Sequence, residues 1–95
     1  MSLDLNEIRQ EIDAIDRQIV ACFEQRMNIV LKVAAYKAEN NMPILDTARE
    51  AQLIASNKER LHNKEYADAL ECVLQELMRV SREMQAELLQ NKIKQ

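Results

Sequence analysis

One stretch of the chain, residues 5–40, reads LNEIRQEIDAIDRQIVACFEQRMNIVLKVAAYKAEN and contains neither glycine nor proline. Its apolar side chains recur three or four residues apart, which keeps one face of an α-helix apolar, and the alternation typical of a strand is absent. These positions are Leu5, Ile8, Ile12, Ile15, Ile19, Cys22, Ile29, Val33 and Tyr36, and the one slot of this pattern without an apolar residue, between Cys22 and Ile29, holds Arg26. We therefore predict a single helix that begins at Ser2 or Asp4 and ends near Asn40, ahead of Pro43.

This predicted helix is too long for a globule built from one chain. At 1.5 Å per residue it measures about 54 Å. A compact chain of 95 residues has a radius of gyration of only about 12 Å. The apolar face must therefore be covered by a partner, most simply a second copy, and we predict a homodimer.

The composition fits one all-helical domain over residues 1–95. The chain is 47% hydrophobic and 31% charged and has no glycine, which excludes disorder, all-β folds and Gly-rich phosphate loops. A net charge of −3, with two tyrosines, one phenylalanine and no tryptophan, argues against a nucleic-acid binder. No apolar run approaches the roughly 18 residues of a membrane helix, and the first residues are acidic and polar. We expect no membrane partner, no secretory signal and a cytoplasmic location.

Two shorter helices are predicted after the long one. Thr47 and Glu50 fit a capping box, which places the second helix at about residues 47–61 with Ala51, Ile54 and Leu61 turned inward. The third helix is expected over about residues 65–90, followed by a frayed tail. Its apolar stripe is Leu70, Val73, Leu74, Leu77, Val80, Met84 and Leu88. Cys22 and Cys72 lie in or near apolar stripes, so we expect buried, reduced thiols.

Arg26 and Lys37 do not belong to a plain helical bundle. Arg26 occupies an apolar slot of the long helix, and a buried guanidinium needs an anionic partner. Lys37 follows about three helical turns later on the same face, about 16 Å along the axis. The two cations could bind a small anion with two charged ends. They could equally form internal ion pairs, which charge counts alone favour. Arg9 lies about 26 Å from Arg26 along the helix, so only a partner chain could bring it to the same ligand.

Other polar residues leave alternatives open. Asp46, Arg49 and Glu50 could bind a ligand at the start of the second helix, or could simply cap it and carry surface charge. Ser81 could be a small core residue bonded to its own backbone. Gln85 lies at the edge of the apolar stripe and needs partners if it is buried. The sequence shows no Cys–His or Ser–His pair and no metal-ligand spacing, so we expect neither a nucleophile nor a metal.

Over about residues 5–89 the chain resembles the all-helical class of chorismate mutase. The shared motifs are I-R-x-E-I-D-x-I-D, the Q-R-M and Y-K-A segments that hold Arg26 and Lys37, P-I-x-D-x-x-R-E ending at Glu50, and S-R-E-M-Q from Ser81 to Gln85. The resemblance implies an intertwined homodimer of three-helix chains. It also implies two equivalent active sites, each of which takes one arginine from the other subunit.

The same resemblance implies the role of each site residue. Arg26 and Arg9 of the partner subunit would hold the two substrate carboxylates, with Arg49 and Ser81 completing the carboxylate end. Lys37 would bind a carboxylate and the ether oxygen, and Gln85 would bind the same ether oxygen. The ring hydroxyl would be received by Glu50 and the Asp46 backbone. Of these, the residues expected to be catalytic are Arg26, Lys37, Glu50 and Gln85.

The reaction implied is the rearrangement of chorismate to prephenate in phenylalanine and tyrosine biosynthesis, without a cofactor. Two alternatives stay open at this point. One is an isochorismate-pyruvate lyase of the same fold, and the other is a non-catalytic dimerisation module in which Arg26 and Lys37 pair internally. Whether another enzyme of the shikimate pathway associates with the chain is also open.

Overall fold

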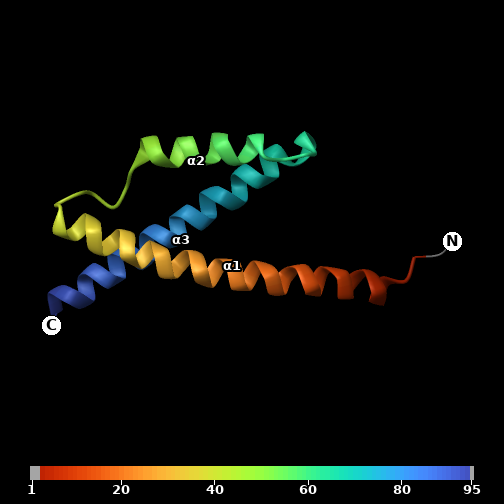
Figure 1. The fold of residues 1–95 in the computed structure, drawn as a ribbon, viewed down its shortest axis with the longest axis horizontal. Helices are drawn as coiled ribbons and strands as arrows, with labels where there is room; N and C mark the ends of the chain where they lie inside the picture. The colour runs from red at the N-terminus through yellow and green to blue at the C-terminus, as the bar shows by residue number, and fades with distance from the viewer. Residues whose placement is uncertain (1–2, 95) are drawn as a thin grey trace.

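The computed structural model describes residues 3–94, and the side chains of residues 3–90. Within that range the chain folds as three α-helices and one short 3-10 helix, without a strand (Figure 1). The long helix α1 spans Leu5–Glu39, the short helix α2 spans Thr47–Glu59, and α3 spans Ala67–Lys94, directly after the 3-10 helix η1 at Lys64–Tyr66. The predicted all-α fold, with its long, short and intermediate helices, is confirmed.

Both ends of α1 follow from local chemistry. The side chain of Asp4 accepts a hydrogen bond from the backbone N–H of Asn6 at 2.9 Å, which caps the first turn. At the other end the backbone N–H of Asn40 donates to the Tyr36 carbonyl, and Asn41 adopts a left-handed conformation with φ of 56°. Asparagine tolerates this conformation better than most residues, so the chain can turn there toward α2.

The start of α2 differs from the predicted capping box. Asp46 is the capping residue, because its carboxylate accepts from the backbone N–H of Arg49 at 3.0 Å. Thr47 is therefore the first helical residue, and Glu50 lies one position beyond the place that a capping box requires. The helix also ends at Glu59, two residues earlier than expected. Its Ala51, predicted to face inward, is exposed.

The third helix begins later and extends further than expected. Residues 64–66 form η1 instead of the first turn of α3, and residues 91–94, predicted to fray, continue the helix. Gln95 lies outside the described residues. Val73 is 62% exposed, whereas the polar side chains of Ser81 and Gln85 are buried. The covered face of α3 is therefore turned away from part of the predicted apolar stripe and toward the polar residues.

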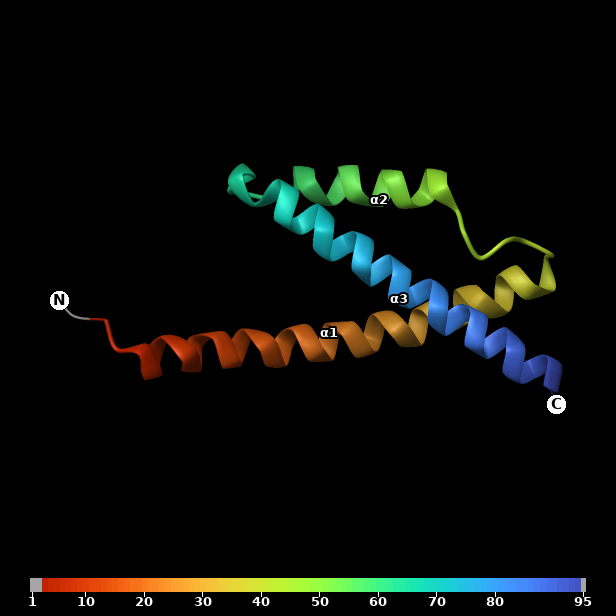
Figure 2. The same cartoon turned by 180° about the vertical axis from the view of Figure 1, so that it is seen from behind.

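The three helices enclose only a small core. In both views α2 leads to η1, and α3 runs back from η1 along a diagonal and crosses α1 (Figures 1 and 2). The buried hydrophobic residues within the described range are Met27, Ala34 and Met78. The molecule is accordingly an elongated strip of 60 × 28 × 15 Å with a radius of gyration of 17.3 Å, well above that of a compact chain of this length.

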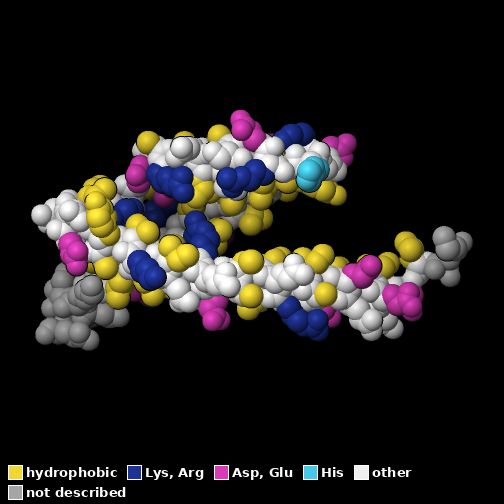
Figure 3. All heavy atoms as spheres, in the orientation of Figure 1, with side chains coloured by type: hydrophobic (Ala, Val, Ile, Leu, Met, Phe, Trp, Pro, Cys, Tyr) yellow, Lys and Arg dark blue, Asp and Glu magenta, His cyan; other side chains and the backbone are white. Residues whose placement is uncertain are grey.

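The N-terminal half of α1 projects from this core as an uncovered arm. Every residue from 9 to 25 is exposed, including Ile12, Ile15 and Ile19 at more than half of their surface. Hydrophobic side chains follow the edge of this arm that faces the open side of the molecule (Figure 3). The chain therefore leaves its longest apolar stripe without a partner, as the length of the helix required. None of the helices within residues 3–94 is both long and apolar enough to cross a membrane.

The two cysteines are free but not buried in this chain. Cys22 lies on the uncovered arm of α1, and Cys72 lies next to the exposed Val73 on α3. The prediction of buried thiols is wrong for the single chain, because an apolar stripe identifies the face that needs cover but not whether the same chain supplies it.

Candidate active site

A cavity of about 260 Å³ lies between the C-terminal half of α1, the connector to α2, the first turns of α2 and the middle of α3. Its apolar walls are Ile29, Val30, Val33, Ile44, Leu53 and Met78. Its polar lining consists of Arg26, Lys37, Asp46, Arg49, Glu50, Ser81, Arg82 and Gln85. On the face shown in Figure 3, Lys and Arg side chains gather around the hollow between α2 and α1. Every predicted site residue except Arg9 lines this one cavity.

Arg26 is held by α3 instead of by an acid. Its Nη1 donates to the Oγ of Ser81 at 2.6 Å, and that hydroxyl donates in turn to the Leu77 carbonyl at 2.8 Å. Burial lowers the pKa of Arg26 from its ordinary value, and the nearby charge of Arg49 lowers it further. A guanidinium still remains protonated in a protein. Arg26 forms no ion pair with any residue whose side chain the structure describes.

Lys37 is anchored by the connector. Its Nζ donates to the backbone carbonyl of Ile44 at 2.7 Å, which leaves two of the three ammonium donors for other acceptors. Within residues 3–90 no carboxylate lies within ion-pairing distance of this ammonium. The interpretation of Arg26 and Lys37 as internal ion pairs is therefore wrong. Both cations line the cavity, and neither is paired with a carboxylate among the described side chains.

Gln85 places an unsatisfied amide in the cavity wall. The side chain is only 6% exposed, and its Oε1 is buried without a hydrogen-bond partner among the described residues. Leaving such a group unpaired costs roughly 1–3 kcal/mol. Rotation of the amide by half a turn would present the NH₂ group in place of the oxygen. A polar ligand in the cavity could supply the hydrogen bond that the described residues do not give to this side chain.

Glu50 and Arg82 form a pair that the sequence did not predict. The Nη1 of Arg82 donates to both carboxylate oxygens of Glu50, at 2.5 and 2.6 Å, and so joins α3 to α2. Arg82 follows Ser81 directly and precedes Gln85 by three residues, a spacing that places all three on one face of a helix. This spacing could have identified Arg82 from the sequence as a neighbour of Ser81 and Gln85, although Arg82 is not part of the apolar stripe.

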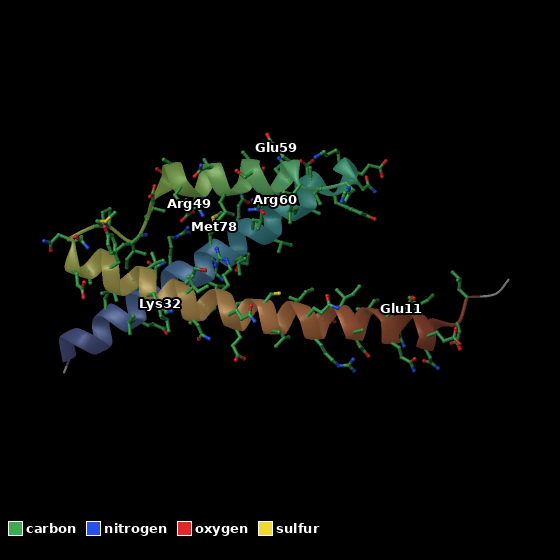
Figure 4. All side chains as sticks on the ribbon, in the orientation of Figure 1. Glu11, Lys32, Arg49, Glu59, Arg60 and Met78 are labelled. Carbon is green, nitrogen blue, oxygen red and sulfur yellow. The ribbon has the colours of Figure 1, made fainter. Side chains whose placement is uncertain are left out.

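The first turn of α2 contributes the remaining polar groups. The Asp46 carboxylate caps the helix, and the Asp46 carbonyl accepts from the backbone N–H of Glu50 at 3.0 Å, so the backbone N–H is the group of Asp46 left to meet a ligand. The guanidinium of Arg49 donates to Gln52 at 3.2 Å, a weak surface contact. Figure 4 shows Arg49 and Met78 in the region between α2 and α3. Arg49 lies close enough to Arg26 to lower the pKa of that guanidinium.

Arg9 is exposed and does not line the cavity. It belongs to the uncovered arm of α1, where Figure 4 shows Glu11, of the same region, far from Arg49 and Met78. The structure therefore does not bring Arg9 to the cavity within one chain. This leaves the predicted contribution from a partner subunit as the only route by which Arg9 could reach such a site.

The charge of the cavity lining is positive. Its lining includes four cationic side chains and two carboxylates, an excess of two positive charges. No group of His, Cys, Asp and Glu side chains suited to a metal ion occurs among the described residues. Hydrogen-bond donors from α1 and α3 face an apolar wall, an arrangement that can orient a partly apolar dianion and stabilise charge that develops on it.

The fold and the cavity define an all-helical domain with one cavity in which cationic side chains outnumber carboxylates. The chain belongs to the family described as chorismate mutase type II, which matches residues 8–86. The resemblance drawn from the motifs is thereby confirmed.

Two relatives of this chain are much longer proteins. The chain is 36% identical over 78 residues to the "T-protein" of Haemophilus influenzae, covering 81% of this chain and 21% of that protein. It is 44% identical over 46 residues to a "bifunctional chorismate mutase/prephenate dehydratase" of Buchnera aphidicola, covering 48% and 12%. The chain thus spans about a fifth of the first relative and less of the second. A solved structure, a "conserved hypothetical protein" from Pyrococcus furiosus, matches with a TM-score of 0.70 and 28% identity over 90% of this chain and 99% of that one.

Proposed function

We propose that this chain is a chorismate mutase, an isomerase that converts chorismate to prephenate in the biosynthesis of phenylalanine and tyrosine. In this rearrangement the ether C–O bond breaks while a C–C bond forms within the same molecule, so no group is added or lost. The observation that carries the proposal is that Arg26 and Lys37 line one cavity and that neither forms an ion pair within residues 3–90. Chorismate carries two carboxylates, which match the cavity's excess of two positive charges.

In the proposed complex each part of the substrate meets a particular set of side chains in the cavity. Arg26, held by Ser81, binds one carboxylate, and Arg49 adds positive charge nearby. Lys37 donates to a carboxylate and to the ether oxygen with the donors that Ile44 leaves free. The unpaired amide of Gln85 donates to the same ether oxygen after it rotates its NH₂ group inward. The ring hydroxyl then lies at the start of α2, near Glu50 and the Asp46 backbone.

Catalysis follows from position and charge, because no proton is transferred. Binding both ends of the dianion holds it in the folded conformer in which the reacting carbons are close. As the C–O bond breaks, the ether oxygen gains negative charge, and donors already aimed at it stabilise the transition state more than the substrate. The apolar walls exclude water and strengthen these interactions. The proposed mechanism needs neither a cofactor nor a nucleophile.

The proposed enzyme is a homodimer that completes each site across the interface. A second copy would cover the apolar stripe on the arm of α1, and it would fill an apolar groove of about 390 Å³ between that arm and α3. Ile15, Ile19 and Phe23 line this groove together with Val73 and Leu77. If the two arms run antiparallel, Arg9 of the partner subunit reaches the cavity and binds the second carboxylate. Since relatives carry this region within bifunctional proteins, an association with another enzyme of the pathway is part of the same proposal.

Direct assays separate this proposal from its alternatives. Purified protein is incubated with chorismate and, separately, with isochorismate, and the products are identified. Prephenate from chorismate is the expected result. Pyruvate and salicylate from isochorismate, without turnover of chorismate, would identify the lyase instead. Absence of turnover, together with an unchanged melting temperature in the presence of a dicarboxylate analogue of the substrate, would leave a non-catalytic module.

A further inference from the structure

Arg82 lines the cavity but has no part in the binding roles given above. Its Nη1 lies 2.5 and 2.6 Å from the two carboxylate oxygens of Glu50, and its contact joins α3 to the first turn of α2. The two side chains are 32% and 24% exposed, so solvent and salt screen this pair less than a pair on the open surface.

We propose that Arg82 is a positioning residue that fixes the ionised carboxylate of Glu50 as the acceptor for the ring hydroxyl of the substrate. Arg82 thereby makes the cavity selective for a ligand that carries this hydroxyl. The inference rests on the proposed function, because it assigns the hydroxyl end of the substrate to the start of α2.

The hydrogen-bonding capacity of Glu50 allows both contacts. A carboxylate has about four acceptor positions, two on each oxygen. Arg82 occupies one position on each oxygen, so that each oxygen keeps a second position for an incoming hydroxyl. Without Arg82 the carboxylate would be partly buried beside the cavity with no cation bonded to it, and it would turn toward water or toward Lys37 or Arg26. Either movement removes the acceptor from the hydroxyl.

The other carboxylate of the cavity, that of Asp46, is oriented by the backbone of α2 and not by Arg82. The side chain of Asp46 accepts from the backbone N–H of Arg49 and is committed to capping α2. Arg82 also differs from the other arginine on that part of α3. Arg79 bonds to Glu76 and Glu83 on the surface of the same helix and does not line the cavity, so it provides a matched control for the loss of one charge from α3.

The test compares two substrates in each variant: chorismate, and the analogue of chorismate that lacks the ring hydroxyl. Replacing Arg82 with Met removes one positive charge from the cavity, which weakens the binding of both dianions alike. The ratio of kcat/KM for chorismate to kcat/KM for the analogue therefore isolates the contribution of the hydroxyl. We expect this ratio to fall about 10- to 100-fold in Arg82→Met, the loss that a displaced contact group produces. Arg79→Met is expected to keep the wild-type ratio.

A second comparison shows whether Arg82 acts through Glu50. In Glu50→Gln the ratio is expected to fall, and adding Arg82→Met should lower it no further, because residues that act as one unit are not additive. Arg82→Lys, which keeps the charge and one donor, should restore part of the ratio. Should Arg82→Met fail to fold, the same comparison is made with Arg82→Gln, for which a smaller fall of the ratio is expected because Gln keeps a hydrogen-bond donor.

The inference is overturned if Arg82→Met slows both substrates by the same factor, or if its effect on the ratio persists in the Glu50→Gln background. The first result would make Arg82 only a source of charge, and the second would mean that it meets the substrate directly. Failure of the proposed function is a different result, since the wild-type protein would then convert neither substrate.

Discussion

Arg26 and Ser81, which lie 55 residues apart in the chain, are joined by a hydrogen bond of 2.6 Å from the guanidinium Nη1 to the hydroxyl oxygen. The proton of that hydroxyl is donated to the Leu77 carbonyl at 2.8 Å, so a lone pair of Oγ is left facing Arg26. Ser81 is 5% exposed and cannot easily turn away. The backbone of α3 thus sets the direction of a cation that belongs to α1.

Replacing Ser81 with Ala should release Arg26 from this position. A hydrogen bond to a charged group contributes about 1.5–3 kcal/mol, and we expect KM for chorismate to rise about tenfold or more with a smaller effect on kcat. Steady-state kinetics and thermal unfolding measure both consequences. Ser56→Ala, at an exposed position of α2, is the control and should behave as the wild type. An unchanged KM in a folded Ser81→Ala protein would show that Arg26 keeps its direction without α3.

Lys37 is expected to act on the transition state. The proposed mechanism gives it a donor for the ether oxygen, and the loss of one such donor typically costs about 10²–10³ in rate, roughly 3–4 kcal/mol. Lys37→Ala should lower kcat by at least this factor. Lys32→Ala removes a lysine from an exposed position of the same helix and should have little effect. If Lys37→Ala keeps near-normal turnover while correctly folded, the role assigned to Lys37 is wrong.

Gln85 provides a prediction about pH. An amide donates at any pH, so the wild-type rate should vary little between roughly pH 5 and 8, where neither carboxylates nor lysines ordinarily titrate. In Gln85→Glu the side chain can donate to the ether oxygen only when it is protonated. Activity of that variant should therefore be highest in acid and fall as the pH rises through the pKa of the introduced carboxyl. A steep loss of wild-type activity above pH 6, or a flat profile for the variant, would contradict this role. The catalytic rate of Gln85→Ala should be lower than that of the wild type by a factor of about 10²–10³ at every pH.

The long helix and its lack of cover could be predicted from the sequence, because both depend on spacing and length. Apolar residues every three or four positions define a helix face, and a face of about 54 Å outgrows any globule of this size. The same reasoning found Arg26, since a cation in an apolar slot is visible in the sequence. Charge counts alone favoured an ion pair over an external anion as the partner of Arg26, but in the structure its guanidinium donates to a serine hydroxyl.

The packing between helices could not be predicted in the same way. A local pattern predicted a capping box with Thr47 as the N-cap residue and Glu50 as its partner. In the structure Asp46, one residue earlier, is the N-cap residue. Glu50 is consequently available for Arg82, which lies 32 residues away and was not singled out. Which residues meet across two helices depends on the direction of the crossing and on rotation about each axis, and spacing along one helix determines neither. The buried face of α3 was displaced from its predicted stripe for this reason.

The apolar arm of α1 makes the proposed dimer testable without touching the cavity. Ile19 is 58% exposed in the single chain and lies in the apolar groove that a second copy would fill. Ile19→Glu would bury an unpaired carboxylate there at a cost of several kcal/mol, so we expect a monomer with little activity. Size-exclusion chromatography with light scattering measures whether the protein is a monomer or a dimer. Ala55→Glu adds the same charge at an exposed position of α2 and should leave the dimer intact. A fully active monomeric Ile19→Glu protein would rule out a shared site.

Mixing two inactive variants tests whether Arg9 and Arg26 meet in one site. Each should be nearly inactive alone, because every site in an Arg9→Ala dimer lacks Arg9, and every site in an Arg26→Ala dimer lacks Arg26. If the sites are shared across a two-fold axis, each mixed dimer has one site with both arginines and one with neither. Random exchange makes half of the dimers mixed, so about a quarter of wild-type activity should return. Samples that are mixed without subunit exchange should stay inactive. If no activity returns after exchange is demonstrated, Arg9 acts within its own chain or not at all.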